Sequence, residues 1–453
     1  MPWVSAANAA LLTDLYELTM AASYHSRGMN AEATFDLFVR ELPPRRNFLV
    51  TCGIEEALSY LEDLRFDDES IAYLRSLGLF QESFLEYLGD LRFSGDVWAM
   101  REGEIAFARE PLLRVSAPLI EAQIVETFLL NCVTFQTMVA SKAARVAIAA
   151  ADRKFLDFSL RRDHGADAGL KAARASFIAG ATATSNVLAG HLFGIPVSGT
   201  MAHSYVMAFG SEIEAFRAFA RDFPDRTILL IDTFDVAQGA QRAVQVAREL
   251  AASGFTLKGV RIDSGDLAAL SHEVRAILDE AGMHETQIVL SGDLDEYRVK
   301  EMLDAAVPVD AFGVGTQMGT SGDAPYLGGV YKLVAEGGIP KVKLSAGKVT
   351  LPGIKQVYRS AENGRFVGDI ISLEDEVVEG TRPLLQPMMA KGRRLHPPED
   401  LHMTRERCAA SLSQLPDALR DLGPQPVTYP VSLSEPLEAL ARQAEQSLAT
   451  HGT

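Results

Sequence analysis

The sequence predicts an α/β protein, with an irregular α/β barrel core and an α+β N-terminal domain that the C-terminal segment completes. Between residues 155 and 314, short apolar strands alternate with amphipathic helices at roughly 25–30 residues per unit. Repeated units of this kind predict a parallel sheet covered by helices, and their length favours a closed barrel over an open sheet. The flanking sequence lacks this regular alternation, so we expect mixed segments on both sides of the barrel.

We expect three segments along the chain. The N-terminal α+β domain covers residues 1–130, the barrel domain covers 131–350, and the C-terminal segment over 351–453 packs back on the N-terminal domain. Apolar residues at helical spacing after Thr13 or Asp14 predict the first helix. The other elements expected before the barrel are a strand over 33–39, helices within 53–91, short strands within 93–118 and a long helix over 121–151.

Within the barrel, each apolar run bounded by turn residues predicts a strand, and each amphipathic run after it predicts a helix. After the barrel, short strands return, and the tail over 398–451 is helical. The barrel strands are expected at 155–159, 195–200, 227–231, 257–262, 287–291 and 311–314.

Composition narrows the function. The net charge of −17 argues against a nucleic-acid or anionic-membrane partner, because phosphate backbones are bound by clustered Lys and Arg. A small anionic substrate is still compatible, since a few local cations outweigh the global field. Three widely spaced cysteines fit a reducing compartment and provide no zinc-site spacing. The N-terminus lacks the layout of a signal peptide, so we expect a cytoplasmic protein.

One stretch carries no Lys, Arg, Asp or Glu from Ala175 to Ser211, although 23% of the chain is charged. It holds too many small polar residues for a membrane span, which needs about 20 mostly apolar residues. We therefore expect buried strands and tight turns that deliver His203, in Gly199-Thr-Met-Ala-His-Ser-Tyr205, to a site. A lone buried histidine is by itself more often structural than catalytic.

Polar residues follow six of the predicted strands in series. The active site of a βα barrel forms at the C-terminal ends of its strands, so we expect these residues to meet. They are Arg161, Thr200, His203, Asp232, Asp235, Arg261, Asp263, Asp266, Ser291, Gly292, Asp293, Gly315 and Thr316.

The glycines and arginines in this set indicate an anionic ligand. Gly313-Val-Gly-Thr316 and Ser291-Gly-Asp293 let backbone N–H groups approach a phosphate, and a following helix N-terminus adds its dipole. Arg161 and Arg261 each offer a planar fork that grips a carboxylate or a phosphate.

The acids in this set have two explanations. Asp232, Asp263 and Asp293 suit a phosphate-chelated Mg²⁺ or ribose hydroxyls. Helix N-capping explains Asp263 or Asp293 singly, but it does not explain the arginines beside them.

Two basic pairs lie elsewhere. Arg45 and Arg46 follow two prolines on a loop, and Lys142 and Arg145 share one face of the long helix. Both pairs fit solvated surface, and all four residues are also candidates for the cations that bind an anionic group such as pyrophosphate.

Five segments of the sequence, taken together, form a specific pattern. Together they resemble the nicotinate phosphoribosyltransferase family, over most of the chain. They are Leu12-Thr-Asp-Leu-Tyr-Glu-Leu-Thr-Met20, Gly199-Thr-Met-Ala-His-Ser204, Leu230-Ile-Asp-Thr-Phe-Asp235, Val260-Arg-Ile-Asp-Ser-Gly-Asp266 and Phe312-Gly-Val-Gly-Thr316.

The resemblance implies that nicotinate and phosphoribosyl pyrophosphate form nicotinate mononucleotide and pyrophosphate, a step of NAD salvage. It implies that ATP serves as co-substrate with Mg²⁺ and phosphorylates His203, and that the protein is a homodimer with shared active sites. Tyr16, contributed across the subunit interface, stacks on the pyridine ring, and Phe158 lies on the other face. Of the remaining residues, the resemblance places Arg161, Thr200 and Arg261 around nicotinate or the ribosyl donor, and Asp263, Gly292, Asp293, Gly315 and Thr316 at the ribose and phosphates, with Asp232 and Ser291 in the same site.

A sister family acts on nicotinamide and carries an Asp that accepts from the amide. The corresponding stretch here, Gly180-Ala-Thr-Ala-Thr-Ser-Asn186, contains no acid. An acid beside a nicotinate carboxylate would repel it, so its absence favours the acid substrate.

Two other classes of function stay open on the residues alone. A phosphate-binding isomerase or aldolase needs a Schiff-base lysine or a carboxylate base in the barrel, and Lys142 and Lys332 are the lysine candidates. A catalytically inactive metabolite-binding protein would not need the whole set of strand-end residues.

Overall fold

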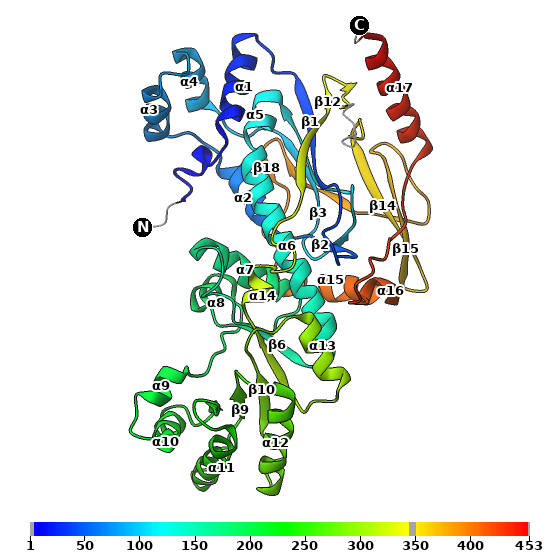
Figure 1. Ribbon diagram of the computed structural model, residues 1–453. Helices are drawn as coiled ribbons and strands as arrows, with labels where there is room; N and C mark the ends of the chain where they lie inside the picture. Colours follow the sequence, from blue (N-terminus) through cyan, green and yellow to red (C-terminus); the bar gives the residue numbers. More distant parts are fainter. Residues whose placement is uncertain (1–3, 344–349, 452–453) are drawn as a thin grey trace. The chain divides into compact units, whose positions relative to one another are not determined.

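The computed structural model describes residues 4–343 and 350–451. The chain forms two compact units, one made of Met1–Ser141 with Tyr326–Thr453 and one made of Lys142–Pro325 (Figure 1). We call the first the terminal unit, because it contains both ends of the chain, and the second the central unit. The long helix α6 (Glu126–Ala150) carries the chain from the first into the second.

A seven-stranded antiparallel sheet organises the terminal unit. Strand β1 (Glu32–Val39) lies between β12 (Gly329–Glu336) and β5 (Pro111–Pro118) and is buried over most of its length. Its polar residue Asp36 is therefore buried too, and Lys355 Nζ lies 2.8 Å from the Asp36 carboxylate as its counterion. The sheet order is β13-β12-β1-β5-β3-β17-β18, with β3 at Asp96–Met100, β13 at Ile339–Pro340, β17 at Leu385–Ala390 and β18 at Arg393–Arg394.

Smaller sheets and helices complete this unit, and α1 and α5 pack together beside the large sheet (Figure 1). The smaller sheets pair β2 (Leu49–Val50) with β4 (Ile105–Ala106), and order β16 (Arg382–Pro383), β14 (Lys355–Glu362), β15 (Arg365–Leu373) and β19 (Val431–Leu433). The helices are α1 (Leu15–Ser26), α2 (Ile54–Asp63), α3 (Asp68–Ser76), α4 (Glu82–Asp90), α5 (Leu119–Ile124), α15 (Leu401–Gln414), α16 (Asp417–Arg420) and α17 (Glu435–His451), with a 3-10 turn at Ala9–Leu11.

One hydrophobic core joins residues from both ends of the chain in the terminal unit. Phe35 of β1 stacks on Tyr331 of β12, with ring centroids 4.8 Å apart. Ile371 of β15 and Leu437 of α17 belong to the same buried cluster. The N-terminal and C-terminal parts of the chain therefore share one core.

The central unit is built on six parallel strands in the order β7-β6-β11-β10-β9-β8, which curl into a half-barrel. The expected α/β architecture is confirmed, with the barrel half closed. The helices α11 and α12 pack on the strands β9 and β10 (Figure 1). The strands are β6 (Lys154–Asp157), β7 (Ala183–Thr184), β8 (Ile228–Leu230), β9 (Gly259–Ile262), β10 (Gln287–Leu290) and β11 (Ala311–Val314). The helices are α7 (Ala166–Ile178), α8 (Val187–Phe193), α9 (His203–Met207), α10 (Glu212–Asp222), α11 (Val236–Ala252), α12 (Leu267–Glu280), α13 (Glu296–Asp304) and α14 (Thr316–Gly319).

The charge-free stretch differs from its prediction. The expected strand over 195–200 is wrong: a single bridge between Thr184 and Val197 takes its place. The expected burial is wrong for most of the stretch from Val187 onward, where Val187 is 70% exposed and Met207 is 60% exposed. Pro196 cannot donate a ladder hydrogen bond, and Gly199 weakens a strand, which explains why pairing stops there.

Two further observations concern membrane spans and cysteines. No helix in the described ranges is both long and apolar enough to cross a membrane. Cys52, Cys132 and Cys408 are all buried thiols outside any disulfide.

Candidate active site at the carboxyl edge of the parallel sheet

His203 begins helix α9 and presents a partly buried ring, its side chain being 37% exposed. Its Nδ1 lies 3.1 Å from the Oγ1 of Thr233. Its Nε2 lies 4.0 Å from Asp232 Oδ1 and 3.9 Å from Asp263 Oδ2. A hydroxyl therefore holds one ring nitrogen while two carboxylates face the other, which fixes the orientation of the imidazole.

The two carboxylates come from neighbouring strand ends. Asp232 is almost fully buried, and its Oδ2 accepts from the Asp263 backbone N–H at 2.9 Å and from the Ser264 hydroxyl at 2.7 Å. The Ser291 hydroxyl donates to Asp263. Asp232 Oδ1 has no hydrogen-bond partner among the described residues, although buried oxygens are normally paired. This oxygen is free to accept a ligand beside His203.

Arg261 connects this acidic pair to the His203 loop. Its Nη1 donates to Thr200 Oγ1 at 2.8 Å, and its Nη2 lies 3.7 Å from Asp263 Oδ1. Burial lowers the pKa of Arg261, Asp263 and Asp232 oppose that shift, and the cation of Arg161 adds to it. Two cations close enough to repel each other, the partly buried Arg261 and the exposed Arg161, make an attractive position for an anion.

Phe158 lies over the strand end of β11. A Cβ at Gly313 would come within 2.5 Å of the Phe158 ring, so only glycine leaves room for the aromatic there. The backbone N–H of Phe158 donates to the Val314 carbonyl at 2.9 Å, and Gly315 passes close to the Phe158 carbonyl. The packing of Phe158 therefore explains why glycine occupies positions 313 and 315.

The turn after β10 is equally tight. Gly292 has a φ of +101°, and a Cβ there would lie 2.0 Å from the Asp263 carbonyl oxygen. Asp293, which follows with a φ of +47°, is exposed at the rim. Thr316 begins α14, a helix of four residues that follows Gly315. These backbones approach the strand ends closely, and their contact with phosphate stays a prediction.

Helix capping accounts for the predicted residues Asp235 and Asp266, but not for Asp232, Asp263 or Asp293. The N-caps of α11, α12 and α13 are Asp235, Asp266 and Asp295, whose side chains accept from backbone N–H groups of the first turn. Asp263 instead contacts Ser291 and Arg261. The capping explanation for Asp263 or Asp293 is therefore wrong.

Sequence reasoning missed the residues that hold the site in place. Thr233 contacts His203, and Ser264 donates to Asp232. Their only signal in the sequence is that each hydroxyl residue directly follows an acid of the site, Thr233 after Asp232 and Ser264 after Asp263. The buried Asp157 accepts from the Ser159 hydroxyl at 2.6 Å and from the Thr184 hydroxyl at 2.7 Å. This cluster anchors the loop that carries Phe158 and Arg161. Burial, and next to it Asp157, raises the pKa of Asp163 in that loop to about 6.

Lys142 and Arg145 do not lie on a solvated face, and that prediction is wrong. Both are about 1% exposed. Lys142 Nζ lies 2.5 Å from Glu296 Oε2 and 2.8 Å from Asp323 Oδ1, and Arg145 Nε lies 2.9 Å from Glu296 Oε1. Their charges are already balanced, which speaks against both a pyrophosphate role and a Schiff-base role for Lys142.

The other predicted residues lie in the terminal unit. Tyr16 is on α1 and 48% exposed, Arg45 is exposed, and Arg46 is buried. Lys332 on β12 lies 4.0 Å from Glu126. Their part in ligand binding stays a prediction.

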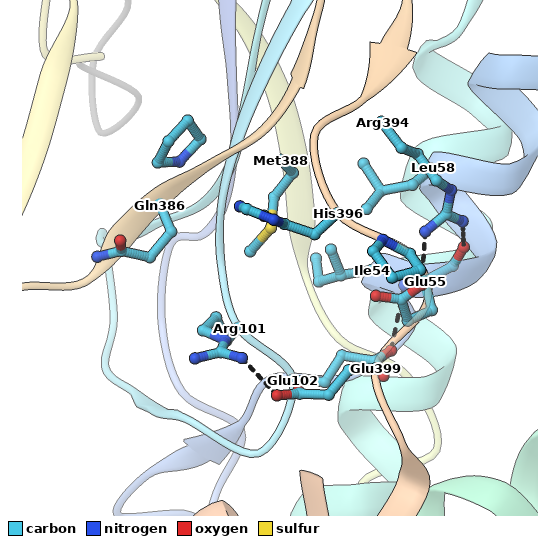
Figure 2. A pocket seen from close by; sticks show the side chains of 12 residues that line it. Ile54, Glu55, Leu58, Arg101, Glu102, Gln386, Met388, Arg394, His396 and Glu399 are labelled. Carbon is cyan, nitrogen blue, oxygen red and sulfur yellow. Dashed lines mark hydrogen bonds and ion pairs between the residues drawn. The ribbon is translucent and has the colours of Figure 1, made fainter. Parts of the chain in front are cut away.

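The terminal unit also contains a pocket of about 390 Å³, shown in Figure 2. Its charged side chains are already engaged with one another or with backbone. Arg101 pairs with Glu399, Arg394 Nη1 lies 2.6 Å from Glu55 Oε2, and Glu102 accepts from the Gly53 backbone N–H at 2.7 Å. Because these groups are matched, the pocket gives no indication of a ligand.

The carboxyl edge of the parallel half-barrel brings Arg261, Asp232 and Asp263 together with an oriented His203, which is the arrangement of an enzyme active site in a barrel fold. Family models match three parts of the chain: the nicotinate phosphoribosyltransferase N-terminal domain at residues 11–134, the family domain at 153–326 and the C-terminal domain at 378–441. The chain belongs to the nicotinate phosphoribosyltransferase family.

Individual relatives agree with this assignment. The nicotinate phosphoribosyltransferase pncB2 of Mycobacterium tuberculosis is 47% identical over 94% of this chain and 92% of that protein. The nicotinate phosphoribosyltransferase of Bacillus subtilis is 43% identical over 83% of this chain and 78% of that protein. The crystal structure of human nicotinic acid phosphoribosyltransferase aligns with a TM-score of 0.86 at 31% identity, covering 95% of this chain and 99% of that chain.

Proposed function

We propose that this protein is a nicotinate phosphoribosyltransferase that forms nicotinate mononucleotide and pyrophosphate from nicotinate and phosphoribosyl pyrophosphate, coupled to ATP hydrolysis through phosphorylation of His203. Family membership and the 47% identical relative support the transferase activity. The observation that carries the histidine role is the ring of His203, held by Thr233 at Nδ1 and faced by Asp232 and Asp263.

The transfer step needs no general base. The bond from C1 of the ribosyl donor to pyrophosphate breaks with its electron pair on the leaving group, and the lone pair of the pyridine nitrogen forms the new bond. Arg161 and Arg261 supply positive charge where the anionic groups lie. Phe158 provides a flat face for the ring, and Tyr16 of a second subunit provides the opposite one, so that the nitrogen is oriented for attack.

The carboxylates fit a Mg²⁺ ion shared with phosphates. Asp232 Oδ1 is buried without a partner in the described part of the chain, and Asp263 Oδ2 faces the same histidine. No cluster of three or more His, Cys, Asp or Glu side chains suited to a metal occurs in the described ranges, so the phosphates would complete the ligand set. When bound, Mg²⁺ would offset charge on the departing pyrophosphate.

The coupling step uses His203 as a nucleophile. The γ-phosphoryl group of ATP passes to a ring nitrogen, ADP leaves, and water later releases the phosphate. A phosphoryl group at this position adds negative charge beside Asp232, Asp263 and the nearby Arg261 network. That change of charge would alter the affinity of the site for the donor and its products.

The choice of nicotinate over nicotinamide follows from the same site. The stretch 180–186 contains no acid, and Ser185 donates its backbone N–H to the Asp157 carbonyl at 2.9 Å. The substrate carboxylate therefore meets arginines rather than a like charge. The proposal also includes a homodimer with shared sites and a cytoplasmic location. The three buried thiols, which form no disulfide, fit that location.

The test is product formation from nicotinate and from nicotinamide, each with and without ATP, for the wild type, His203→Ala and the control His191→Ala. His191 is an exposed histidine on α8 of the same unit. We expect product from nicotinate, stimulation by ATP, and loss of that stimulation only in His203→Ala. Equal rates with nicotinamide contradict the substrate, and ATP stimulation that survives in His203→Ala contradicts the phosphohistidine.

A further inference from the structure

Thr184, at the end of the short strand β7, is a buried residue that bonds to two different loops of the candidate active site. One loop follows β6 and carries Phe158 and Arg161. The other lies between α8 and α9 and carries Thr200. Thr184 therefore stands between the two segments that deliver these predicted substrate contacts.

The side chain of Thr184 is bonded to the first loop. Its hydroxyl accepts the Asn186 backbone N–H at 3.0 Å, and in the described part of the chain its single proton has one acceptor, Asp157 Oδ2 at 2.7 Å. The other carboxylate oxygen of Asp157 accepts the Ser159 backbone N–H at 2.9 Å. Asp157, Ser159 and Thr184 are each no more than 1% exposed, so water does not compete for these bonds. Thr184 thereby holds the turn of the chain on either side of Phe158.

The backbone of Thr184 is bonded to the second loop. Its N–H donates to the Pro196 carbonyl at 3.0 Å, and its carbonyl accepts the Ser198 N–H at 3.0 Å. Among the described residues, these two are the only backbone–backbone hydrogen bonds of residues 195–200. Thr200 follows Ser198 by two positions, so its place depends on the contact with Thr184.

The fold gives this second loop little other support. Residues 195–200 belong to no helix or strand, and Val197 is 52% exposed. Segments with few buried contacts move more easily than the sheet that they join. Thr200 accepts from Arg261 Nη1 at 2.8 Å, and Arg261 in turn lies beside Asp263. The bonds of Thr184 therefore influence where Thr200 meets Arg261.

We propose that Thr184 is a positioning residue for nicotinate: its hydrogen bond to Asp157 holds the loop of Phe158 and Arg161 in register with the loop of Thr200. This inference rests on the proposed function, in which these residues surround the pyridine ring and its carboxylate. A pocket built from two loops loses affinity when the loops shift, because the ring contact and the charge contact are no longer made together. Thr184 is buried, so it acts through Asp157 and not on the substrate itself.

The experiment measures KM for nicotinate, KM for phosphoribosyl pyrophosphate, kcat and the melting temperature. The variants are Thr184→Val, Thr184→Ser and the control Thr182→Val. Valine has the shape of threonine but cannot donate to Asp157, whereas serine can. The Thr182 hydroxyl donates to the Phe155 carbonyl at 3.0 Å, so the control removes a similar hydrogen bond two residues away and outside both loops.

We expect Thr184→Val to raise KM for nicotinate about tenfold, and KM for phosphoribosyl pyrophosphate by less than about threefold. Thr184→Ser and Thr182→Val should keep both KM values within about twofold of the wild type, because the bond to Asp157 is retained. A role in stability alone lowers the melting temperature and the amount of active enzyme, and hence kcat, but leaves KM of the folded enzyme unchanged. KM for nicotinate therefore distinguishes positioning from stability.

A folded Thr184→Val enzyme with the wild-type KM for nicotinate overturns the inference. A Thr184→Ser enzyme whose KM rises as much as that of Thr184→Val does so too. If Thr184→Val does not fold, Asp157→Asn decides by the same measure, because the amide has no second acceptor oxygen for the Thr184 proton. Absence of product from nicotinate with the wild type overturns the proposed function and this inference together, whereas product with the wild type and an unchanged KM in the folded variant overturns this inference alone.

Discussion

The Thr233 hydroxyl lies 3.1 Å from Nδ1 of His203, so a residue at the end of the β8 segment orients the first residue of helix α9. The two residues are 30 positions apart in the sequence and meet only through the fold. The bond fixes which ring nitrogen faces Asp232 and Asp263.

We predict that Thr233→Val weakens ATP coupling. The valine removes one hydrogen bond of about 1 kcal/mol, which corresponds to a fall of roughly fivefold in ATP-stimulated turnover. ATP-free transfer should stay close to wild type. The measurement is the initial rate with and without ATP, and Thr256→Val, an exposed threonine of the same unit, is the control. Equal losses with and without ATP would mean that Thr233 serves the transfer step instead.

Arg261→Lys should lower kcat/KM for phosphoribosyl pyrophosphate by about 10²–10³-fold, because a lysine cannot hold Thr200 and an anion with one planar fork. Steady-state kinetics with varied donor concentration measure this. The control is Arg217→Lys, an arginine paired with Glu249 on the surface of the same unit. A loss below threefold in Arg261→Lys would place the donor elsewhere.

Gly292→Ala should reduce activity at least tenfold by displacing Asp263. An added Cβ would lie 2.0 Å from the Asp263 carbonyl oxygen, and φ is +101°. Gly254→Ala is the matched control, since its φ is +82° but nothing lies within 4 Å of the added Cβ. The control should lose about 1 kcal/mol of stability and keep its activity. Similar activities in the two variants would show that the close approach is not needed.

Glu296→Ala should destabilise the protein by about 3–5 kcal/mol, because it leaves Lys142 and Arg145 buried without their shared counterion. Chemical denaturation followed by far-UV circular dichroism measures the change in the free energy of unfolding. Glu301→Ala, an exposed acid on the same helix, is the control and should be nearly neutral. A neutral effect of Glu296→Ala would contradict a structural role for the buried cluster.

Glu17 also gives a pH dependence of stability. Its pKa is about 7 when folded and ordinarily 4.5, so between these values the folded state keeps a proton that the unfolded state has lost. Raising the pH from 5 to 7.5 therefore favours unfolding, by up to about 3 kcal/mol from this group. Glu17→Gln should remove this part of the slope. Parallel slopes of wild type and Glu17→Gln in urea unfolding at both pH values would contradict the raised pKa.

The strand-end residues could be predicted from sequence because a parallel sheet brings all carboxyl ends to one edge. Asp232 and Asp263 face His203 there, and Arg261 contacts Asp263 and Thr200. The periodic helices and buried strands followed from their apolar spacing in the same way.

Other features depend on tertiary contacts that no local pattern records. Lys142 and Arg145 have the spacing of a surface pair, but Glu296 lies 151 positions after Arg145 and balances both of them in the interior. The position of Glu17 in the first turn of α1 is typical of an exposed acid that interacts with the helix dipole, but Glu17 is buried and contacts Thr127 of α6. The charge-free stretch predicted burial, but the absence of charge does not by itself supply a strand partner, and Val197 forms only a bridge.

The most direct test of the account is a label on His203. The protein is incubated with ATP carrying a labelled γ-phosphoryl group, and acid-labile label is mapped by peptide mass spectrometry. We predict label on the peptide containing Gly199-Thr-Met-Ala-His-Ser204, chased off by nicotinate and phosphoribosyl pyrophosphate together, and absent from His203→Ala. Label on another residue, or full ATP stimulation with no label on His203, would contradict the central claim.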